Sequence, residues 1–285
     1  MIYDSRPCEL GEGALWHPER RQLFWFDILG KKLHTVGRDG PQSWTFVEMV
    51  SAAGWVTRDH LLIAGERDLF LFELESEEIE TLTELEAGNP GTRSNDGRAD
   101  RQGGFWIGTM GKRGGDDPGL GSIYRWYRGE LRKLFGGLTI PNSICFSPDG
   151  RTGYFADTVT QRINRVPLDA DGWPAGEPET FVNLADQRVY PDGATIDAAG
   201  NLWSAQWGAG RVACYAPDGT FVRAVSFDAP HTSCPAFGGP DLTMLFVTTA
   251  QEGLDAAALS LVPLSGQTFA AANVAKGIPE PQVIL

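Results

Sequence analysis

One motif recurs at four places along this chain, and its spacing limits the possible folds more than any other feature. Each copy begins with a polar residue, is apolar or small four positions later, and then passes through a turn into a short hydrophobic strand such as FWIGT (105–109). The four polar residues are Glu12, Asn95, Asn142 and Asp192. Because repeated units stack around an axis or along a line, equivalent positions come together if the array closes on itself.

Two further copies lack the polar residue but keep the strand pattern. One lies between Glu12 and Asn95, at 52–65, and the other lies near the end of the chain, at 233–249. The copies follow one another at intervals of roughly 40–50 residues, which is typical of a four-stranded propeller blade and long for a leucine-rich repeat. Asp-Gly and Ala-Gly turns separate the strands, at 38–40, 147–150, 197–200 and 216–219.

Six such units predict an all-β chain that forms one domain, residues 1–285, as a six-bladed β-propeller. Its blades would be four-stranded and antiparallel, around a central metal site. A closed ring is favoured because an open row of six units would leave long unpaired strand edges. We expect the terminal segments 1–7 and 279–285 to close the ring by contributing strands to one shared blade. An ordinary β-sandwich or two stacked domains remain alternatives.

Composition excludes some classes of partner. The net charge of −13 argues against nucleic acid, which requires a basic face. No apolar stretch is long enough to span a bilayer, and the N-terminus has no basic and then hydrophobic signal region, so a cytoplasmic location without a membrane partner is expected. The four cysteines have no CxxC spacing and are expected to be reduced core residues: Cys8, Cys145, Cys214 and Cys234.

Each polar residue of the motif has a structural interpretation beside the functional one. Glu12 lies between two glycines, which suits an exposed turn but also lets the backbone pack tightly and the side chain project toward an axis. Asn142 follows a proline and could bond its own backbone at the start of a strand.

Asp192 is part of a Pro-Asp-Gly sequence, which is a common turn tripeptide. The chain has two others, at Asp149 and Asp218, which we interpret as hairpin turns. Asp192 differs because it begins a repeat unit, whereas the other two lie inside theirs. Its position in the repeat therefore favours a functional role.

Two carboxylates and two amides at one point would bind a hard cation. An all-oxygen ligand set favours Ca²⁺, Mg²⁺ or Mn²⁺. The four histidines lack HxxxH and HxH spacing, which argues against a histidine-based zinc site. Arg93, two residues before Asn95, could bind a substrate oxygen with its fork of donors or lie at the surface. No GxSxG elbow and no P-loop is present.

Five segments resemble the senescence-marker-protein/gluconolactonase/regucalcin family, in the order in which that family has them. They are 10–28, 93–110, 140–158, 191–212 and 232–239. The resemblance implies a six-bladed β-propeller of metal-dependent lactonases, in which zinc and ferrous iron can also occupy the site. It further implies that Glu12, Asn142 and Asp192 are the metal ligands and that Arg93 and Asn95 contact the sugar lactone.

The expected activity is therefore metal-dependent hydrolysis of a small sugar lactone to its aldonic acid, with Asp192 as the catalytic base. The substrate would be a glucono-, xylono-, arabinono- or galactonolactone. The alternatives are a phosphotriesterase-like hydrolase and a non-catalytic calcium- or ligand-binding propeller. One position departs from the family: Asp117, in the loop 112–120, replaces a substrate-contacting glutamate of some animal relatives, and it receives no role here. The sequence does not indicate an oligomeric state.

Overall fold

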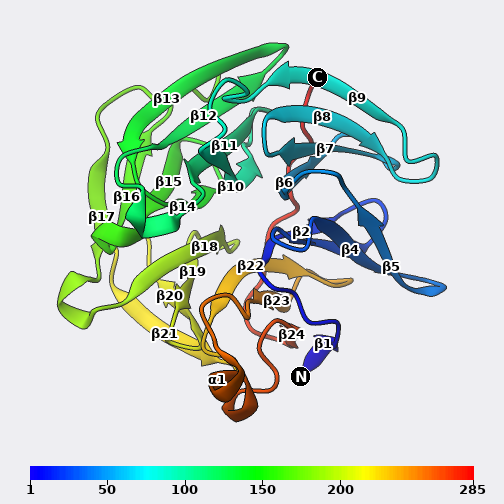
Figure 1. Cartoon of the computed structure of the whole chain (residues 1–285). Helices are drawn as coiled ribbons and strands as arrows, with labels where there is room; N and C mark the ends of the chain where they lie inside the picture. Colours follow the sequence, from blue (N-terminus) through cyan, green and yellow to red (C-terminus); the bar gives the residue numbers. More distant parts are fainter.

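Six four-stranded antiparallel sheets stand around a central axis in the computed structural model, which describes residues 1–285 (Figure 1). Each sheet is one blade, and the prediction of a six-bladed β-propeller is confirmed. The innermost strands of blades 1 to 6 are β2 (Gly11–His17), β6 (Val50–Trp55), β10 (Thr92–Ala99), β14 (Pro141–Phe146), β18 (Tyr190–Ile196) and β22 (Thr232–Gly238). These strands contact one another around the axis, so residues at equivalent positions approach each other.

The remaining strands lie progressively farther from the axis. The second strands are β3 (Gln22–Asp27), β7 (His60–Gly65), β11 (Phe105–Gly111), β15 (Thr152–Asp157), β19 (Leu202–Trp207) and β23 (Met244–Thr249). The third strands are β4 (Lys32–Gly37), β8 (Asp68–Glu73), β12 (Gly121–Tyr127), β16 (Arg162–Pro167), β20 (Arg211–Tyr215) and β24 (Thr268–Ala271). The outermost strands are β5 (Gly40–Thr45), β9 (Ile79–Glu84), β13 (Glu130–Leu138), β17 (Glu179–Asn183), β21 (Phe221–Ser226) and β1 (Ile2–Asp4).

Helical structure is confined to short connections. The α-helix α1 (Ala256–Leu261) lies between β23 and β24, and three 3₁₀ turns interrupt other loops: η1 (Gly114–Asp116), η2 (Thr158–Thr160) and η3 (Ala185–Gln187). No helix has both the length and the apolar character that crossing a membrane requires. The predicted Pro-Asp-Gly turns at Asp149 and Asp218 are confirmed, since each carboxylate accepts from the backbone N–H two residues later.

The N-terminus closes the ring. Strand β1 is the outermost strand of blade 6 and pairs with β24, with Ile2 opposite Phe269. The prediction for the C-terminal segment is wrong, because residues 279–285 form no strand. Pro279 and Pro281 lack the N–H groups that a central strand needs.

The C-terminal segment instead crosses from blade 6 to blades 2 and 3, as the red trace in Figure 1 shows. The N–H of Val283 donates to the carbonyl of Trp55, and the N–H of Ile284 donates to the carbonyl of Gly103, both over 2.9 Å. The side chain of Val283 is buried in the apolar cluster that joins these two blades. The segment therefore links blades that are far from it in sequence.

The core consists of one apolar cluster between each pair of neighbouring blades. Successive side chains of a strand point to opposite faces of the sheet. Phe24 and Phe26 of β3 accordingly pack toward blade 2, whereas Leu23 and Trp25 pack toward blade 6. The four cysteines are buried and unpaired, as predicted. This continuous ring of core clusters holds the six inner strands rigidly around the axis.

Candidate active site

A β-bulge interrupts the innermost strand of every blade at the position of the repeated polar motif. The pairing register shifts between Glu12 and Leu15, between Asn142 and Cys145, and at the equivalent points of the other inner strands. A bulge places an extra residue in one strand and redirects its side chains. Gly13 and Ser143, which follow the polar residue in their copies, have φ angles of +58° and +56°. Glycine adopts this conformation without strain, which explains its place after Glu12.

The five residues predicted for the site line one pocket of about 550 Å³: Glu12, Arg93, Asn95, Asn142 and Asp192. All five are buried, with at most 6% of their surface exposed. A larger groove of about 700 Å³ lies between blades 4 and 5 and contains none of them. The concentration of buried polar groups in the smaller pocket makes it the candidate active site.

A chain of hydrogen bonds orients the amides of the pocket. Arg93 Nη1 donates to Asn95 Oδ1 over 2.9 Å, and Asn95 Nδ2 donates to Asn142 Oδ1 over 3.0 Å. Asn142 Nδ2 donates in turn to Thr158 Oγ1 over 2.9 Å, and that hydroxyl donates to the carbonyl of Pro191 over 2.7 Å. These bonds connect blades 3, 4 and 5 and turn the carbonyl oxygen of Asn142 toward blade 3.

Two carboxyl groups of the pocket, those of Glu12 and Asp192, perturb each other. Burial raises the pKa of Glu12 to about 8, and the charge of Asp96 adds to this effect. Burial also raises the pKa of Asp192 well above its ordinary value, and the charge of Glu12 raises it further. Removing a carboxylate from water is costly unless a positive charge compensates it.

The donor set fits a hard divalent cation. Glu12 and Asp192 offer carboxylate oxygens, and Asn142 offers an amide oxygen whose orientation Asn95 fixes. Such oxygen ligands suit Ca²⁺, Mg²⁺ and Mn²⁺. A divalent charge between the two carboxylates would also compensate for their burial. These three residues are therefore the ones that could hold a metal ion in this pocket.

The structure adds residues to the pocket that the sequence did not indicate: Lys112, Arg113, Thr158, Tyr190 and Glu252. Glu252 lies in the loop after β23, and the positive charge of Arg93 acts on its carboxyl group. Thr158 follows β15 directly, but no repeated pattern marks it as a site residue. Trp207 also lines the pocket and stacks on His231 with ring centroids 4.2 Å apart.

Asp117 does not line the pocket. Its carboxylate accepts from Nε of Arg113 over 2.8 Å and from the N–H of Arg113 over 3.0 Å. Arg113 lines the pocket in its place. The departure from the family at Asp117 thus affects the pocket through a neighbouring guanidinium group rather than directly.

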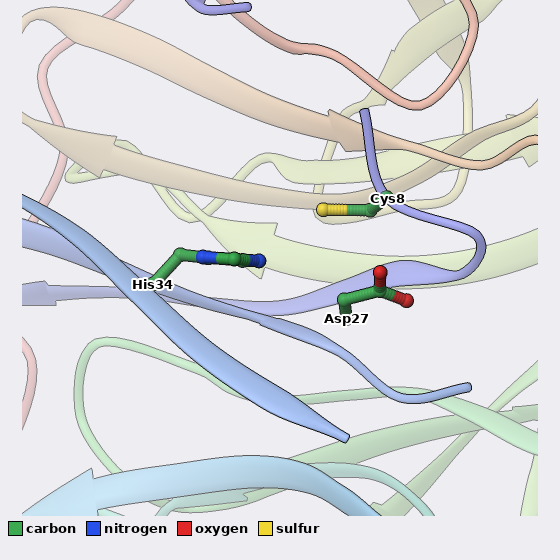
Figure 2. Close-up of side chains that lie close together, drawn as sticks. All are labelled: Cys8, Asp27 and His34. Carbon is green, nitrogen blue, oxygen red and sulfur yellow. The ribbon is translucent and has the colours of Figure 1, made fainter. Parts of the chain in front are cut away.

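A second group of potential metal ligands lies outside the pocket. Cys8, Asp27 and His34 have ligand atoms within 4.8 Å of one another and are all buried (Figure 2). The carboxylate of Asp27 accepts from three backbone N–H groups, those of Glu9, Leu10 and Gly30. This bonding closes the loop before β2, and Asp157 accepts in the same way from two N–H groups before β14. These hydrogen bonds give the carboxylate of Asp27 a structural role in holding this loop.

The family model described as SMP-30/Gluconolactonase/LRE-like region matches residues 10–251. An L-arabinolactonase from Azospirillum brasilense is 36% identical over 281 residues, which cover 95% of this chain and 90% of that protein. A 6-deoxy-6-sulfogluconolactonase from Pseudomonas putida is 33% identical over 279 residues, which cover 97% of this chain and 95% of that protein.

A crystal structure with the same fold comes from Agrobacterium tumefaciens str. C58. It is described as a calcium-binding protein, regucalcin, and is 41% identical to this chain with a TM-score of 0.97. The match covers 100% of this chain and 97% of that chain. The resemblance deduced from the five sequence segments is thus confirmed at the level of the family.

Proposed function

The chain belongs to the SMP-30/gluconolactonase/LRE-like family, and from this premise we propose that it is a divalent-metal-dependent hydrolase that opens sugar lactones to aldonic acids. The observation that carries the proposal is the convergence of Glu12, Asn142 and Asp192 on one pocket from three different blades. The names of the L-arabinolactonase and the 6-deoxy-6-sulfogluconolactonase support a sugar lactone as the substrate class. Glucono-, xylono-, arabinono- and galactonolactone are the first candidates.

A divalent cation held by these three residues would draw electron density from the lactone carbonyl and stabilise the negative charge that develops on its oxygen. We assign proton transfer to Asp192. Its carboxylate takes a proton from the attacking water as the new C–O bond forms. It returns that proton to the ring oxygen as the ring C–O bond breaks, which gives the open acid.

Arg93 and Asn95 are assigned to holding the sugar. Arg93 uses Nη1 for Ser94 and Asn95, and its Nε and Nη2 form no hydrogen bond within the protein. Those two nitrogens remain for hydroxyl groups of the substrate. Asn95 uses Nδ2 within the protein, so its contribution to the sugar is the second lone pair of Oδ1. Fixing the sugar in this way keeps the carbonyl close to the reacting groups.

The test compares the metal-free protein with the protein reloaded with Ca²⁺, Mg²⁺, Mn²⁺, Zn²⁺ or Fe²⁺ on a panel of aldonolactones. We expect hydrolysis to depend on the added metal, and Asp192→Ala to lose metal binding and hydrolysis while it remains folded. Full hydrolysis after chelation would show that the metal requirement is wrong. An organophosphate ester in the same panel tests a phosphotriesterase-like activity.

A calcium-binding propeller without catalysis is the second candidate, because the similar Agrobacterium structure is described as a calcium-binding protein. Under this alternative, Ca²⁺ binds with loss of binding in Asp192→Ala, but no metal restores hydrolysis of any lactone. The panel separates the two candidates in one experiment.

A further inference from the structure

The charged residues of the pocket are divided by sign. The three cations all come from blade 3: Arg93 lies on β10, and Lys112 and Arg113 follow β11 directly. The three carboxylates come from blades 1, 5 and 6, in Glu12, Asp192 and the Glu252 loop. The pocket thus has a basic wall opposite acidic ones.

Two of these cations, Lys112 and Arg113, form no bond with the residues of the proposed metal site. Lys112 pairs with Glu66 of blade 2, and Arg113 pairs with Asp117. Neither cation bonds to Glu12, Asn142 or Asp192. The side chain of Arg113 is 74% exposed, and exposed ion pairs contribute little free energy. Its charge is therefore available to a ligand at small cost.

Both cations also keep hydrogen-bond donors free. Lys112 Nζ has three donors and uses one of them, on Glu66. Arg113 directs Nε and Nη2 at the same oxygen of Asp117, and Nη1 has no protein partner. The ion pair with Asp117 orients the guanidinium group of Arg113 at the pocket. It leaves Nη1 of Arg113 able to donate to an anion.

We propose that Lys112 and Arg113 form an anion subsite and that the preferred substrate is a lactone with a negatively charged group at the end remote from the lactone carbonyl. This deepens the proposed function and rests on it. With the carbonyl directed to Glu12, Asn142 and Asp192, the far end of the sugar reaches the blade 3 wall. A carboxylate or a sulfonate there accepts charge-assisted hydrogen bonds, whereas a hydroxymethyl group would gain only neutral ones.

The experiment measures kcat/KM for glucono-1,5-lactone, for the 1,5-lactone of glucaric acid and for glucono-1,5-lactone with a sulfonate in place of the terminal hydroxyl group. These substrates differ only at the remote end. For the wild-type protein we expect the anionic-to-neutral ratio to be about tenfold or more, as charge-assisted hydrogen bonds imply. The larger of the two anionic ratios identifies carboxylate or sulfonate as the matching group.

Variants then locate the subsite. Lys112→Gln with Arg113→Gln should reduce the ratio to about one. Asp117→Asn should raise it, because Asn keeps an acceptor for Arg113 but removes the competing negative charge. Lys133→Gln on the outer strand β13 is the matched control and should leave the ratio unchanged. The proposal is overturned if the wild-type ratio is near one or if the double variant keeps the wild-type ratio.

A protein that hydrolyses none of these lactones contradicts the proposed function but leaves the subsite testable. Calorimetric titration then compares glucarate with gluconate. Glucarate should bind about tenfold more tightly, and the double variant should abolish the difference. Equal affinities would reject the subsite independently of catalysis.

Discussion

The side-chain amide of Asn95 donates from Nδ2 to Oδ1 of Asn142 over 3.0 Å. Asn95 belongs to blade 3 and Asn142 to blade 4, so this bond joins a proposed substrate residue to a proposed metal ligand. The orientation of the ligand oxygen thus depends on a neighbour that also holds Arg93. The proposed substrate residue and the proposed metal ligand thus share one amide hydrogen bond.

Thr158→Val is expected to weaken metal binding. The hydroxyl accepts from Asn142 Nδ2 and donates to the carbonyl of Pro191, next to Asp192. Losing a partner that orients a metal ligand typically reduces affinity or activity by about 10- to 100-fold. Isothermal titration of the metal-free protein with each cation measures this. Thr160→Val, which removes a hydroxyl from the same 3₁₀ turn outside the pocket, should retain wild-type affinity.

Divalent cations are expected to stabilise the folded protein. The buried carboxylates of Glu12 and Asp192 lack a cationic partner among the hydrogen-bonded contacts of the pocket. A ligand at one hundred times its Kd adds about 2.7 kcal/mol to the free energy of unfolding. Thermal unfolding with chelator or with each metal tests this expectation. Asp192→Asn should lose most of the metal-dependent increase in Tm, whereas the exposed-turn variant Asp149→Asn should keep it.

Asp100→Ala is expected to destabilise blade 3 strongly. Asp100 Oδ2 accepts from Arg125 Nε over 2.6 Å, and both side chains are 0% exposed. The same oxygen accepts from Trp106 Nε1. Removing one partner of a buried ion pair costs about 3–5 kcal/mol. Chemical denaturation should show this loss, whereas Glu130→Ala, which breaks the exposed pair with Arg132, should cost about 1 kcal/mol or less.

The contribution of His17 and His34 to stability is expected to decrease as the pH is lowered from about 6.5, the ordinary pKa of histidine, to about 4, the pKa of both residues in the folded protein. Burial lowers the pKa of His17 and of His34 to about 4. At these two positions the unfolded chain therefore binds protons that the folded chain does not bind, and their contribution to the free energy of unfolding decreases as the pH falls through this window. Each histidine should contribute about 1–2 kcal/mol after solvent screening.

Denaturation of His17→Gln at several pH values tests this expectation. At pH 7 both histidines are neutral in the folded and in the unfolded chain, so the wild-type protein retains their full contribution to stability. The variant should lose less stability than the wild type on going from pH 7 to pH 4. An unchanged slope would mean that the pKa of His17 is the same in the folded and the unfolded chain.

Val283→Ala is expected to lower the free energy of unfolding by weakening the packing between blades 2 and 3. The side chain is 1% exposed and packs in the cluster with Ala99 and Phe105. Removing two methyl groups from a packed core costs about 2 kcal/mol. The free energy of unfolding measures the effect. Leu285→Ala, at a residue that is 47% exposed, is the control and should change that free energy by about 0.5 kcal/mol or less.

The sequence by itself determined the number of blades, the order of the main strands and the five candidate residues that share one pocket. This was possible because strand alternation, turn tripeptides and the repeat interval are local properties, and a closed ring brings equivalent local positions together. The distinction between Asp192 and the turn residues Asp149 and Asp218 follows from repeat register alone. The division of the four polar residues into metal and substrate groups rested on family resemblance.

Only the tertiary structure decided how the blades meet. The approach of Glu252 to Arg93 and the position of Arg113 in place of Asp117 depend on loops that share no repeat position. The same holds for Val283, whose place between blades 2 and 3 no local pattern indicates. A repeat fixes what is equivalent in every blade, whereas loops and termini differ from blade to blade and are positioned by long-range packing. The proposed substrate preference lies in those loops, and so it became visible only in the folded protein.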